Sequence, residues 1–364
     1  MKCITVGLDV GNESVKLVDY LGHVINPNVI CRSSVLNVYD DRVSPEDYIN
    51  FTIVSGAVTG DFFLGNLAAR QDSGRTLFMP AGANKAEEAQ YYVAALGALA
   101  YRAMQVHLDP HESEIAVRLV LSLPMRDWFR SRSVVEKKLV GEHLVAMGSM
   151  PGVGGRTVAI HIVSVLVSIE GMAALINNVY DLSGGAKNQA LRDGTVRVVD
   201  IGKETTDLPK LKRMIPQPEP ESTWEDWGAG RHLDAIIRKA RDQYGVVIPN
   251  PAQLAAALIH DNGLWKVRGR QVDLRQLAAE EFSGLAERAA RTVEAHFGDD
   301  VDVCIMVGGA TDAVRPYLGH FLDLKKYPIV MGHEGECLLE NARGNYLIGL
   351  GRKWAPVERD AKGA

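Results

Sequence analysis

Cysteine, aromatic residues and long apolar runs are all scarce in this chain of 364 residues. Its four cysteines lie far apart, without a CxxC pair or a neighbouring histidine pair, which argues against a zinc site and favours a reduced, cytoplasmic protein. The longest apolar run, 158–169, is interrupted by His161 and is shorter than the roughly 18 residues that suggest a membrane-spanning helix. The chain opens on strand-like residues 4–8, without the apolar core of a signal peptide, so we expect no membrane attachment.

A strong excess of one charge is also lacking. Lysine and arginine number 40 against 45 aspartates and glutamates, for a net charge of −5. Because proteins that bind nucleic acid or membrane surfaces normally need a cationic face, we expect no direct contact with either. The hydrophobic content of 46% is that of an ordinary globular protein, and the length predicts two or three domains at ~100–200 residues each.

What the sequence does contain is a weak internal repeat. Residues 4–17 read ITVGLDVGNESVKL and residues 195–208 read TVRVVDIGKETTDL. Each is a β-branched strand followed by Asp, an apolar residue, Gly, any residue, Glu and a hydroxyl residue, so each half of the chain is predicted to open on a similar hairpin. Chance is the alternative, because strand–Asp–Gly turns are common in hairpins.

The rest of the chain alternates predicted strands with predicted helices. This alternation indicates a mixed α/β fold. A glycine turn at 227–230 enters a further helix, and the composition of 216–221 (PQPEPE) is typical of a linker or exposed loop. The clearest elements are a helix over 87–104, a strand over 117–123, a helix over 274–297 and a strand over 301–307.

Each repeated hairpin has the residues of a phosphate site. An aspartate at a strand end, followed by a tight glycine turn, directs several backbone N–H groups to one point, which suits phosphate oxygens. The aspartate itself repels phosphate, so its expected role is to hold a hydrated Mg²⁺ that bridges to the phosphates. Hydroxyls at Ser14, Thr205 and Thr206 add donors, and Lys16 adds positive charge.

A third segment, CIMVGGATDAVRPYL at 304–318, is an apolar strand that ends in two glycines. The glycines allow a flat ligand to approach the backbone, and a helix predicted from about Asp312 would direct its positive end toward that ligand. The alternative is a strand-to-helix turn that simply requires small residues.

In order and spacing these segments resemble the actin-like ATPase superfamily. VGLDVGNESVKLVD (6–19) is similar to its first phosphate loop, VVDIGKETTDL (198–208) to its second and MVGGATDAV (306–314) to its adenosine loop, while 165–178 and 336–350 are similar to its two connecting helices. The resemblance implies an α/β fold of two duplicated ribonuclease-H-like domains around a nucleotide cleft. It places domain I at 1–168, with the helix 336–356 returning to it, and domain II at 169–335.

Within the superfamily the chain is most similar to the bacterial plasmid-segregation actins (ParM, also called StbA) and related archaeal actin-like proteins. The similarity rests on TTD at 205–207, LVLSLPMRDW at 119–128 and NKAEEAQYYVAALGALA at 84–100. It implies a cytoplasmic nucleotidase that uses Mg²⁺ with ATP or GTP, assembles with itself into filaments and drives plasmid or DNA segregation through a DNA-binding adaptor protein.

The resemblance also implies residue roles. Asp9 and Asp200 would be catalytic and would hold the metal through water, and Glu170 would orient the attacking water, although an ordinary acid at a helix start is the alternative for Glu170. The implied phosphate-binding residues are Gly11, Asn12, Glu13, Ser14, Lys16, Gly202, Lys203, Thr205 and Thr206. The implied nucleoside-binding residues are Gly230, Asp234, Gly308, Gly309, Ala310 and Asp312.

One departure and two alternatives remain open. The second loop carries Lys203-Glu204 where many relatives have a small residue or an acid after the first glycine, which leaves the loop geometry and the choice between ATP and GTP undetermined. The alternatives are a small-molecule kinase and a chaperone-like or division-scaffold ATPase of the same superfamily. No segment after the first loop resembles a sugar-binding signature, and the motifs occupy the chain up to Trp354.

Overall fold

The computed structural model describes residues 1–32, 49–69, 76–77, 83–148, 155–249, 251–267 and 269–354. The chain forms two compact units. Unit 1 comprises residues 1–169, 182–184 and 342–364, and unit 2 comprises 170–181 and 185–341. The last helix, α10 (Glu340–Gly351), therefore begins in unit 2 and continues in unit 1.

The centre of unit 1 is five strands in the order β3-β2-β1-β8-β10. β1 pairs with β2 in antiparallel fashion and with β8 in parallel, and β8 and β10 are also parallel. The bounds are β1 Cys3–Val10, β2 Ser14–Asp19, β3 Gly22–Pro27, β8 Glu114–Leu123 and β10 Thr157–Ile169. Antiparallel strands extend the sheet in the order β9 (Gly141–Met147), β5 (Ile49–Ser55), β6 (Gly60–Leu64), β4 (Ile30–Arg32) and β7 (Thr76–Leu77).

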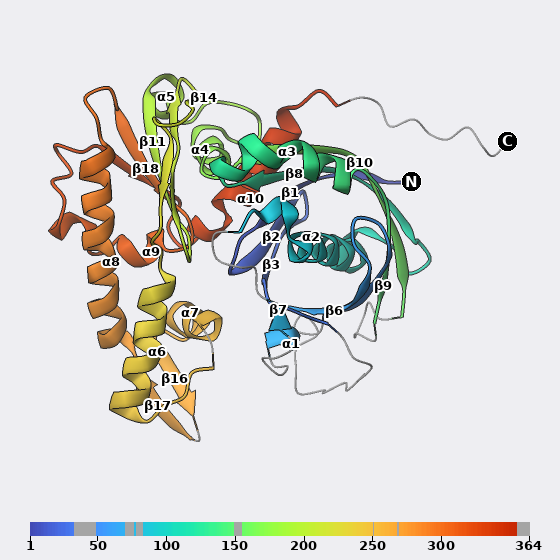
Figure 1. Cartoon of the computed structure of the whole chain (residues 1–364), viewed down its shortest axis with the longest axis horizontal. Helices are drawn as coiled ribbons and strands as arrows, with labels where there is room; N and C mark the ends of the chain where they lie inside the picture. Colours follow the sequence, from blue (N-terminus) through green and yellow to red (C-terminus); the bar gives the residue numbers. More distant parts are fainter. Residues whose placement is uncertain are drawn as a thin grey trace. The chain divides into compact units, whose positions relative to one another are not determined.

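This long sheet curls around one helix, α2 (Ala89–Arg102), which contacts β1, β2, β9 and β5 among others (Figure 1). Every residue from Tyr91 to Arg102 is buried. A helix covered on all sides must be apolar all round, which explains why residues 91–101 read YYVAALGALAY, without a charged side chain. Gly97 allows the ring of Phe51 to approach, since a Cβ there would lie 2.5 Å from Phe51 Cζ.

A buried ion network fixes the end of α2 to the end of β2. Arg102 donates two hydrogen bonds to the Asp19 carboxylate, at 2.7 and 2.9 Å, and His107 Nε2 lies 2.8 Å from Asp19 Oδ2. His107 ends a turn of π-helix, Ala103–His107, that follows α2. Burial opposes ionisation of Asp19, but the hydrogen bonds from His107 and Arg102 outweigh it and hold the pKa of Asp19 well below its ordinary value.

On the other face of this sheet, α3 (Met125–Leu139) packs against β10 and β8. The unit 1 part of α10 lies directly on β1 and β8. A Cβ on Gly7 would lie 2.3 Å from Ala342 O, and one on Gly349 would lie 2.6 Å from the Thr5 side chain. Two glycines, one on the strand and one on the helix, thus allow this close contact. Short helical turns complete the unit at α1 (Asn66–Ala69) and at Lys85–Glu87.

Unit 2 repeats the same strand order. β11 pairs in parallel with β18, and β18 pairs in parallel with β19. On its other side β11 pairs antiparallel with β12 and β13, two short strands separated by Pro209, and β15 and β14 lie beyond them. The bounds are β11 Thr195–Ile201, β12 Thr206–Leu208, β13 Lys210–Lys212, β14 Ile215–Pro216, β15 Thr223–Glu225, β18 Val303–Val307 and β19 Ile329–Met331.

Helices cover both faces of the unit 2 sheet. Alternate residues of β11 and β18 face opposite hydrophobic cores, as the period of two requires. α4 (Met172–Val179) and α5 (Gln189–Asp193) cover one face, and α8 (Arg275–His296) and α9 (Thr311–Val314) cover the other, with turns of 3₁₀-helix at Leu318–His320 and Cys337–Leu339. A third core joins the start of α8 to α6 (Gly230–Tyr244), α7 (Pro251–His260) and the hairpin β16 (Leu264–Val267) and β17 (Arg270–Asp273).

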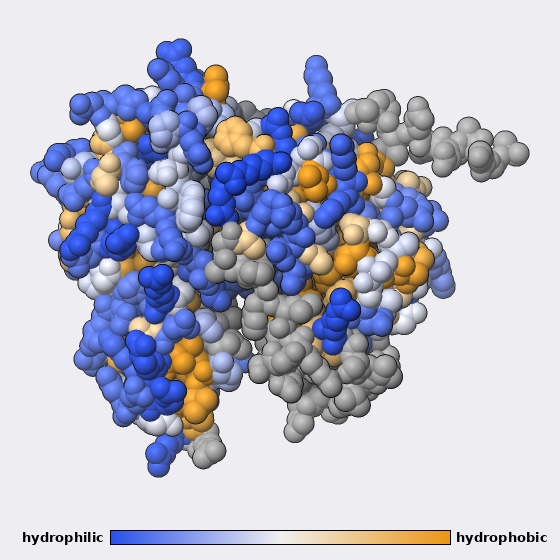
Figure 2. All heavy atoms as spheres, in the orientation of Figure 1, coloured by the Kyte–Doolittle hydropathy of each residue, from blue (hydrophilic) through white to orange (hydrophobic). Residues whose placement is uncertain are grey.

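These elements confirm most of the sequence expectations and correct some. The helix predicted over 274–297 is α8, and the strand predicted over 117–123 is β8, which begins three residues earlier. The strand predicted from 301 begins at Val303, and the helix predicted from about Asp312 is a four-residue turn. Within the described residues, no helix is long and apolar enough to cross a bilayer. Hydrophilic residues cover most of the face drawn in Figure 2, with small hydrophobic patches between them.

Candidate functional site

The first candidate element is the turn between β1 and β2 in unit 1. Gly11 N–H donates to Ser14 O at 3.0 Å, which closes a tight turn over Asn12 and Glu13. Asn28, just beyond β3, holds this turn from outside, because its side-chain Nδ2 donates to Gly11 O at 2.7 Å and its backbone N–H donates to Glu13 O at 2.8 Å. The turn is therefore held by the pairing of β1 with β2 and by Asn28, which follows β3.

Asp9 and Lys16 lie directly opposite each other in this hairpin. Lys16 Nζ and Asp9 Oδ2 are 3.0 Å apart, and both side chains are buried. A Cβ at Gly11 would lie 2.8 Å from Lys16 Nζ, so glycine leaves room for the ammonium group beside the turn. The structure thus places one carboxylate, one ammonium group and a glycine turn together at the end of β1.

The hairpin between β11 and β12 in unit 2 has the same construction. Gly202 N–H donates to Thr205 O at 3.0 Å, the same bond between corresponding residues. The strand register is also the same, with the difference that Asp200 faces Asp207 where Asp9 faces Lys16. A basic group is paired with the aspartate of the first hairpin, whereas the second hairpin brings two carboxylates to opposed positions.

The segment that enters α6 supports the second turn. Ala229 N–H donates to Gly202 O at 3.0 Å, and Gly230 N–H donates to Lys203 O at 2.8 Å. A Cβ at Gly228 would lie 2.4 Å from Lys203 O, so only glycine fits there. The structure therefore brings Gly230 to the second hairpin, whereas Asp234 lies one helical turn further along, on an exposed position of α6.

Thr206 anchors the same segment, since its hydroxyl donates to Trp227 O at 2.9 Å and is fully buried. A cluster around Glu225 then fixes the indole of Trp227, because the Glu225 carboxylate accepts hydrogen bonds from Trp227 Nε1 and Thr292 Oγ1. Burial opposes ionisation of Glu225, but its hydrogen bonds, led by that from Trp227, lower its pKa below the ordinary value.

The glycine pair that ends β18 lies against the second hairpin. Gly308 has a φ of +91°, and a Cβ there would lie 2.4 Å from Asp200 Oδ1 and 2.6 Å from Ile201 O. Ala310 N–H donates to Ile201 O at 3.3 Å. Gly308 and Ala310 are therefore in contact with the strand that carries Asp200, while Gly309 adjoins Leu338.

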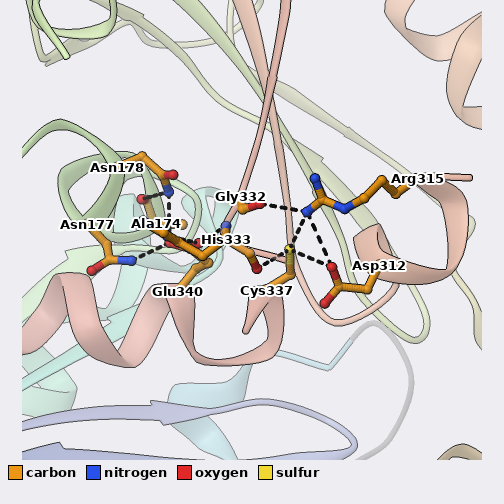
Figure 3. Close-up of polar contacts among 9 residues, drawn as sticks. All are labelled: Ala174, Asn177, Asn178, Asp312, Arg315, Gly332, His333, Cys337 and Glu340. Atoms are coloured by element: carbon orange, nitrogen blue, oxygen red, sulfur yellow. Dashed lines mark hydrogen bonds and ion pairs between the residues drawn. The ribbon is translucent and has the colours of Figure 1, made fainter. Parts of the chain in front are cut away.

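Asp312 is held by its own neighbours (Figure 3). Its Oδ1 accepts hydrogen bonds from Arg315 at 3.3 Å and from the Cys337 thiol at 3.4 Å, and Arg315 also donates to Gly332 O at 2.6 Å. Burial, together with the negative charge of Asp312, raises the pKa of Cys337 to about 12, so the thiol stays protonated. The structure thus accounts for Asp312 as part of a local network behind the glycine loop.

Glu170 precedes α4 rather than forming part of it. It is buried, with 9% of its surface exposed, and is followed by Gly171 with a φ of +76°. A Cβ at Gly171 would lie 2.9 Å from Pro209 Cγ, so the turn requires glycine for both its conformation and its space. This sharp turn, at the end of β10, determines where the Glu170 carboxylate is held.

Three residues that the sequence reasoning missed belong to these elements. Asp207 could have been found from the hairpin register, because it lies as far after Asp200 as Lys16 lies after Asp9. Asn28 and Asn341 could not have been found in this way, since each contacts a residue outside its own local segment. Asn341 Nδ2, for example, donates to Asp200 Oδ2 at 2.9 Å across 141 positions.

Within the described residues, no group of three or more histidines, cysteines or acids is arranged to hold a metal ion. Mg²⁺ is typically held by one or two carboxylates together with substrate phosphates and water. In unit 2, Asp200 and Asp207 offer the hard oxygen donors that such a site needs, and in unit 1 Asp9 offers one.

Two family models match parts of this chain. Residues 7–172 match the family model for the N-terminal domain of actin-like proteins, and residues 198–319 match that for the C-terminal domain of archaeal MreB-like actin homologues. A search of curated protein sequences finds no match.

Solved structures share the fold at low sequence identity. ParM of Bacillus thuringiensis, solved with ATP, superposes with a TM-score of 0.76 at 16% identity, covering 96% of this chain and 99% of that one. The actin-like protein Alp7A gives 0.77 at 16%, covering 96% of each chain, and an archaeal actin homologue gives 0.70 at 18%, covering 95% and 98%. At such identities the likeness shows the fold.

Proposed function

Since the chain belongs to the actin-like ATPase superfamily, we propose that it is a nucleotidase that polymerises with bound ATP or GTP and disassembles after hydrolysis. The observation that carries the proposal is the pair of matching hairpins. Each unit ends the first strand of its sheet in an aspartate, closes the turn with the same glycine N–H bond and keeps the same register. Two such turns, one per unit, suit a polyphosphate held from both sides.

In this proposal the domains predicted at 1–168, with 336–356, and at 169–335 face each other across a nucleotide cleft. The turns Gly11–Ser14 and Gly202–Thr205 offer backbone N–H groups to the β- and γ-phosphates. Lys16 adds charge to one side. The glycine loop 308–310 and Gly230 lie by the nucleoside.

Mg²⁺ fits the residues present. Asp200 and Asp207 occupy opposed positions in the second hairpin, so both can offer carboxylate oxygens to one ion. Asp9 and Asp200 would hold the ion through its water molecules, which is how Mg²⁺ usually binds. The bound ion would neutralise charge on the phosphates.

Glu170 is the proposed water-orienting residue. Its carboxylate can accept a hydrogen bond from a water molecule and direct the water's lone pair toward the γ-phosphate. Its burial and the fixed turn at Gly171 support this role, because a residue that orients a water molecule must keep its side chain in one conformation.

The cellular role that we propose is plasmid or DNA segregation in the cytoplasm. The supporting observation is the shared fold with ParM, which has been solved with ATP and with AMPPNP. With a net charge of −5, direct DNA binding by the chain itself is disfavoured, so a DNA-binding adaptor would make that contact.

Sedimentation tests the assembly. The protein is titrated into the tens of micromolar with Mg²⁺ and ATP, GTP, ADP or no nucleotide, and the pellets are quantified. A head-to-tail contact that does not close into a ring propagates without limit, so a pellet should appear above a critical concentration with ATP or GTP. Pellets that stay flat in all four conditions would contradict the filament and favour a small-molecule kinase.

Two variants test the site. Asp200→Ala should weaken Mg²⁺-nucleotide binding and abolish turnover, whereas Glu170→Gln should bind nucleotide and assemble but release phosphate roughly 10²–10⁴-fold more slowly. The filaments of Glu170→Gln should therefore persist longer than those of the wild type. If Glu170→Gln releases phosphate at the wild-type rate for an equal mass of filament, Glu170 does not orient the attacking water.

A further inference from the structure

Asn341, in the first turn of α10, uses both ends of its buried side-chain amide. Its Oδ1 accepts hydrogen bonds from the backbone N–H of Gly171 at 2.9 Å and of Ala174 at 3.2 Å. Its Nδ2 donates to Asp200 Oδ2 at 2.9 Å. One side chain therefore joins the turn that carries Glu170 to the carboxylate at the end of β11.

The first of these contacts supplies a missing helix cap. The N-cap position of α4 is Gly171, which has no side chain to accept the first N–H groups of the helix. Asn341 provides that acceptor from 167 positions along the chain. The Glu170–Gly171 turn therefore depends on a tertiary contact as well as on the glycine in its own sequence.

The second contact limits how Asp200 can rotate. Gly308 lies against Oδ1, and Asn341 donates to Oδ2, so both oxygens have a defined neighbour. A side-chain amide can accept from N–H groups and donate to a carboxylate at once, which an aspartate or an aliphatic residue at this position cannot do.

The preceding residue, Glu340, fixes where α10 starts. Its buried carboxylate accepts hydrogen bonds from the side chains of Asn177 and Asn178 on α4 and from the backbone and ring of His333, as Figure 3 shows. Glu340 thus ties the last turn of α4 to α10, and none of these contacts involves Asp200. Because Asn341 directly follows Glu340 in α10, these contacts also restrict the position of its backbone.

We propose that Asn341 is a positioning residue that couples the metal-holding carboxylate Asp200 to the water-orienting residue Glu170. The inference rests on the proposed nucleotidase function. It predicts that Asn341 acts on two measurable quantities, the Mg²⁺-dependent part of nucleotide affinity through Asp200 and the turnover number through Glu170.

The test compares Asn341→Leu, Asn341→Asp and the control Asn177→Ala, which removes one α4–α10 hydrogen bond away from Asp200. Binding of a fluorescent ATP analogue is measured with Mg²⁺ and with EDTA. In Asn341→Leu the gain in affinity that Mg²⁺ provides should shrink about tenfold, the typical effect of losing one hydrogen bond to a charged group. Asn177→Ala should keep the wild-type gain.

Asn341→Asp separates positioning from helix capping. It keeps the acceptor for Gly171 and Ala174, but it cannot donate to Asp200 and places a second carboxylate beside it. A role confined to capping predicts wild-type affinity and turnover for this variant, whereas the proposal predicts that the gain in affinity from Mg²⁺ shrinks at least tenfold while kcat changes less than threefold. Because Asn341→Asp retains the cap, it also serves if Asn341→Leu fails to fold.

A double-mutant cycle with Glu170→Gln completes the experiment. If Asn341 acts through Glu170, adding Asn341→Leu to Glu170→Gln should lower kcat by less than about twofold further. Fully additive losses, or a wild-type Mg²⁺ effect in both Asn341 variants, would overturn the inference while leaving the nucleotidase intact. A wild-type protein that neither binds nor hydrolyses nucleotide would overturn the function itself.

Discussion

Gly308 offers a sharp test of how the glycine loop supports the second hairpin. Alanine at this position would suffer twice. Its φ of +91° is a conformation that costs a residue with a Cβ ~1–2 kcal/mol, and the added carbon would lie 2.4 Å from Asp200 Oδ1 and 2.6 Å from Ile201 O. Overpacking of this kind costs about 1–3 kcal/mol, so Gly308→Ala should lower the free energy of unfolding by about 2–5 kcal/mol.

Two other glycines separate these contributions. Gly245 has a φ of +66° and nothing within 4 Å of an added Cβ, so Gly245→Ala measures the backbone cost alone. Gly309 has an ordinary backbone, and its added carbon would meet only the flexible side chain of Leu338, at 2.9 Å. We expect Gly309→Ala to cost less than about 1 kcal/mol, since a flexible neighbour can move aside.

The assay is urea unfolding followed by tryptophan fluorescence, together with nucleotide affinity in the presence of Mg²⁺. Of the three variants, Gly308→Ala should have the lowest free energy of unfolding. It should also bind the nucleotide with Mg²⁺ at least tenfold more weakly, because the displaced Asp200 carboxylate is the one proposed to hold the metal. A Gly308→Ala variant no less stable than Gly245→Ala would refute the reasoning, since the close contact with Asp200 would then carry no energy.

Three further predictions concern the packing of the units. Asp19→Asn should lower the free energy of unfolding by about 3–5 kcal/mol at pH 7, because it leaves Arg102 buried beside a neutral partner. The difference from the wild type should shrink below about pH 4. There Asp19 becomes protonated in the unfolded wild-type chain, so its lowered pKa in the folded protein contributes less to stability. Gly97→Ala should destabilise the protein by about 1–3 kcal/mol, although alanine normally favours a helix, because the added methyl meets the Phe51 ring. Thermal unfolding measures the change, and a higher melting temperature for the variant would contradict the close contact with Phe51. A thiol reagent should label Cys3 in the native protein, and labelling of any other cysteine before unfolding would contradict the burial of Cys31, Cys304 and Cys337.

Features that depend only on neighbouring residues could be predicted from the sequence. Both hairpins could be predicted from residues 4–17 and 195–208, because alternation along a strand and a glycine turn act over fewer than ten positions. The long helix α8 and the strand β18 could be predicted to within two residues for the same reason. The order of these motifs was enough to indicate the actin-like fold, which the comparisons with solved structures confirm.

Which side chains meet at the ends of those strands depends on contacts between distant parts of the chain, and these are visible only in the folded protein. Asp312 is one example, because its carboxylate accepts a hydrogen bond from the Cys337 thiol, which lies 25 positions later in the chain. The sequence predicts a helix over 87–104, but only the fold shows that the curled sheet buries every residue from Tyr91 to Arg102. Asn341 carries no local signal at all. Its neighbours Gly171 and Asp200 lie 170 and 141 positions away, and only the packing of α10 against α4 and β11 brings one side-chain amide within reach of both.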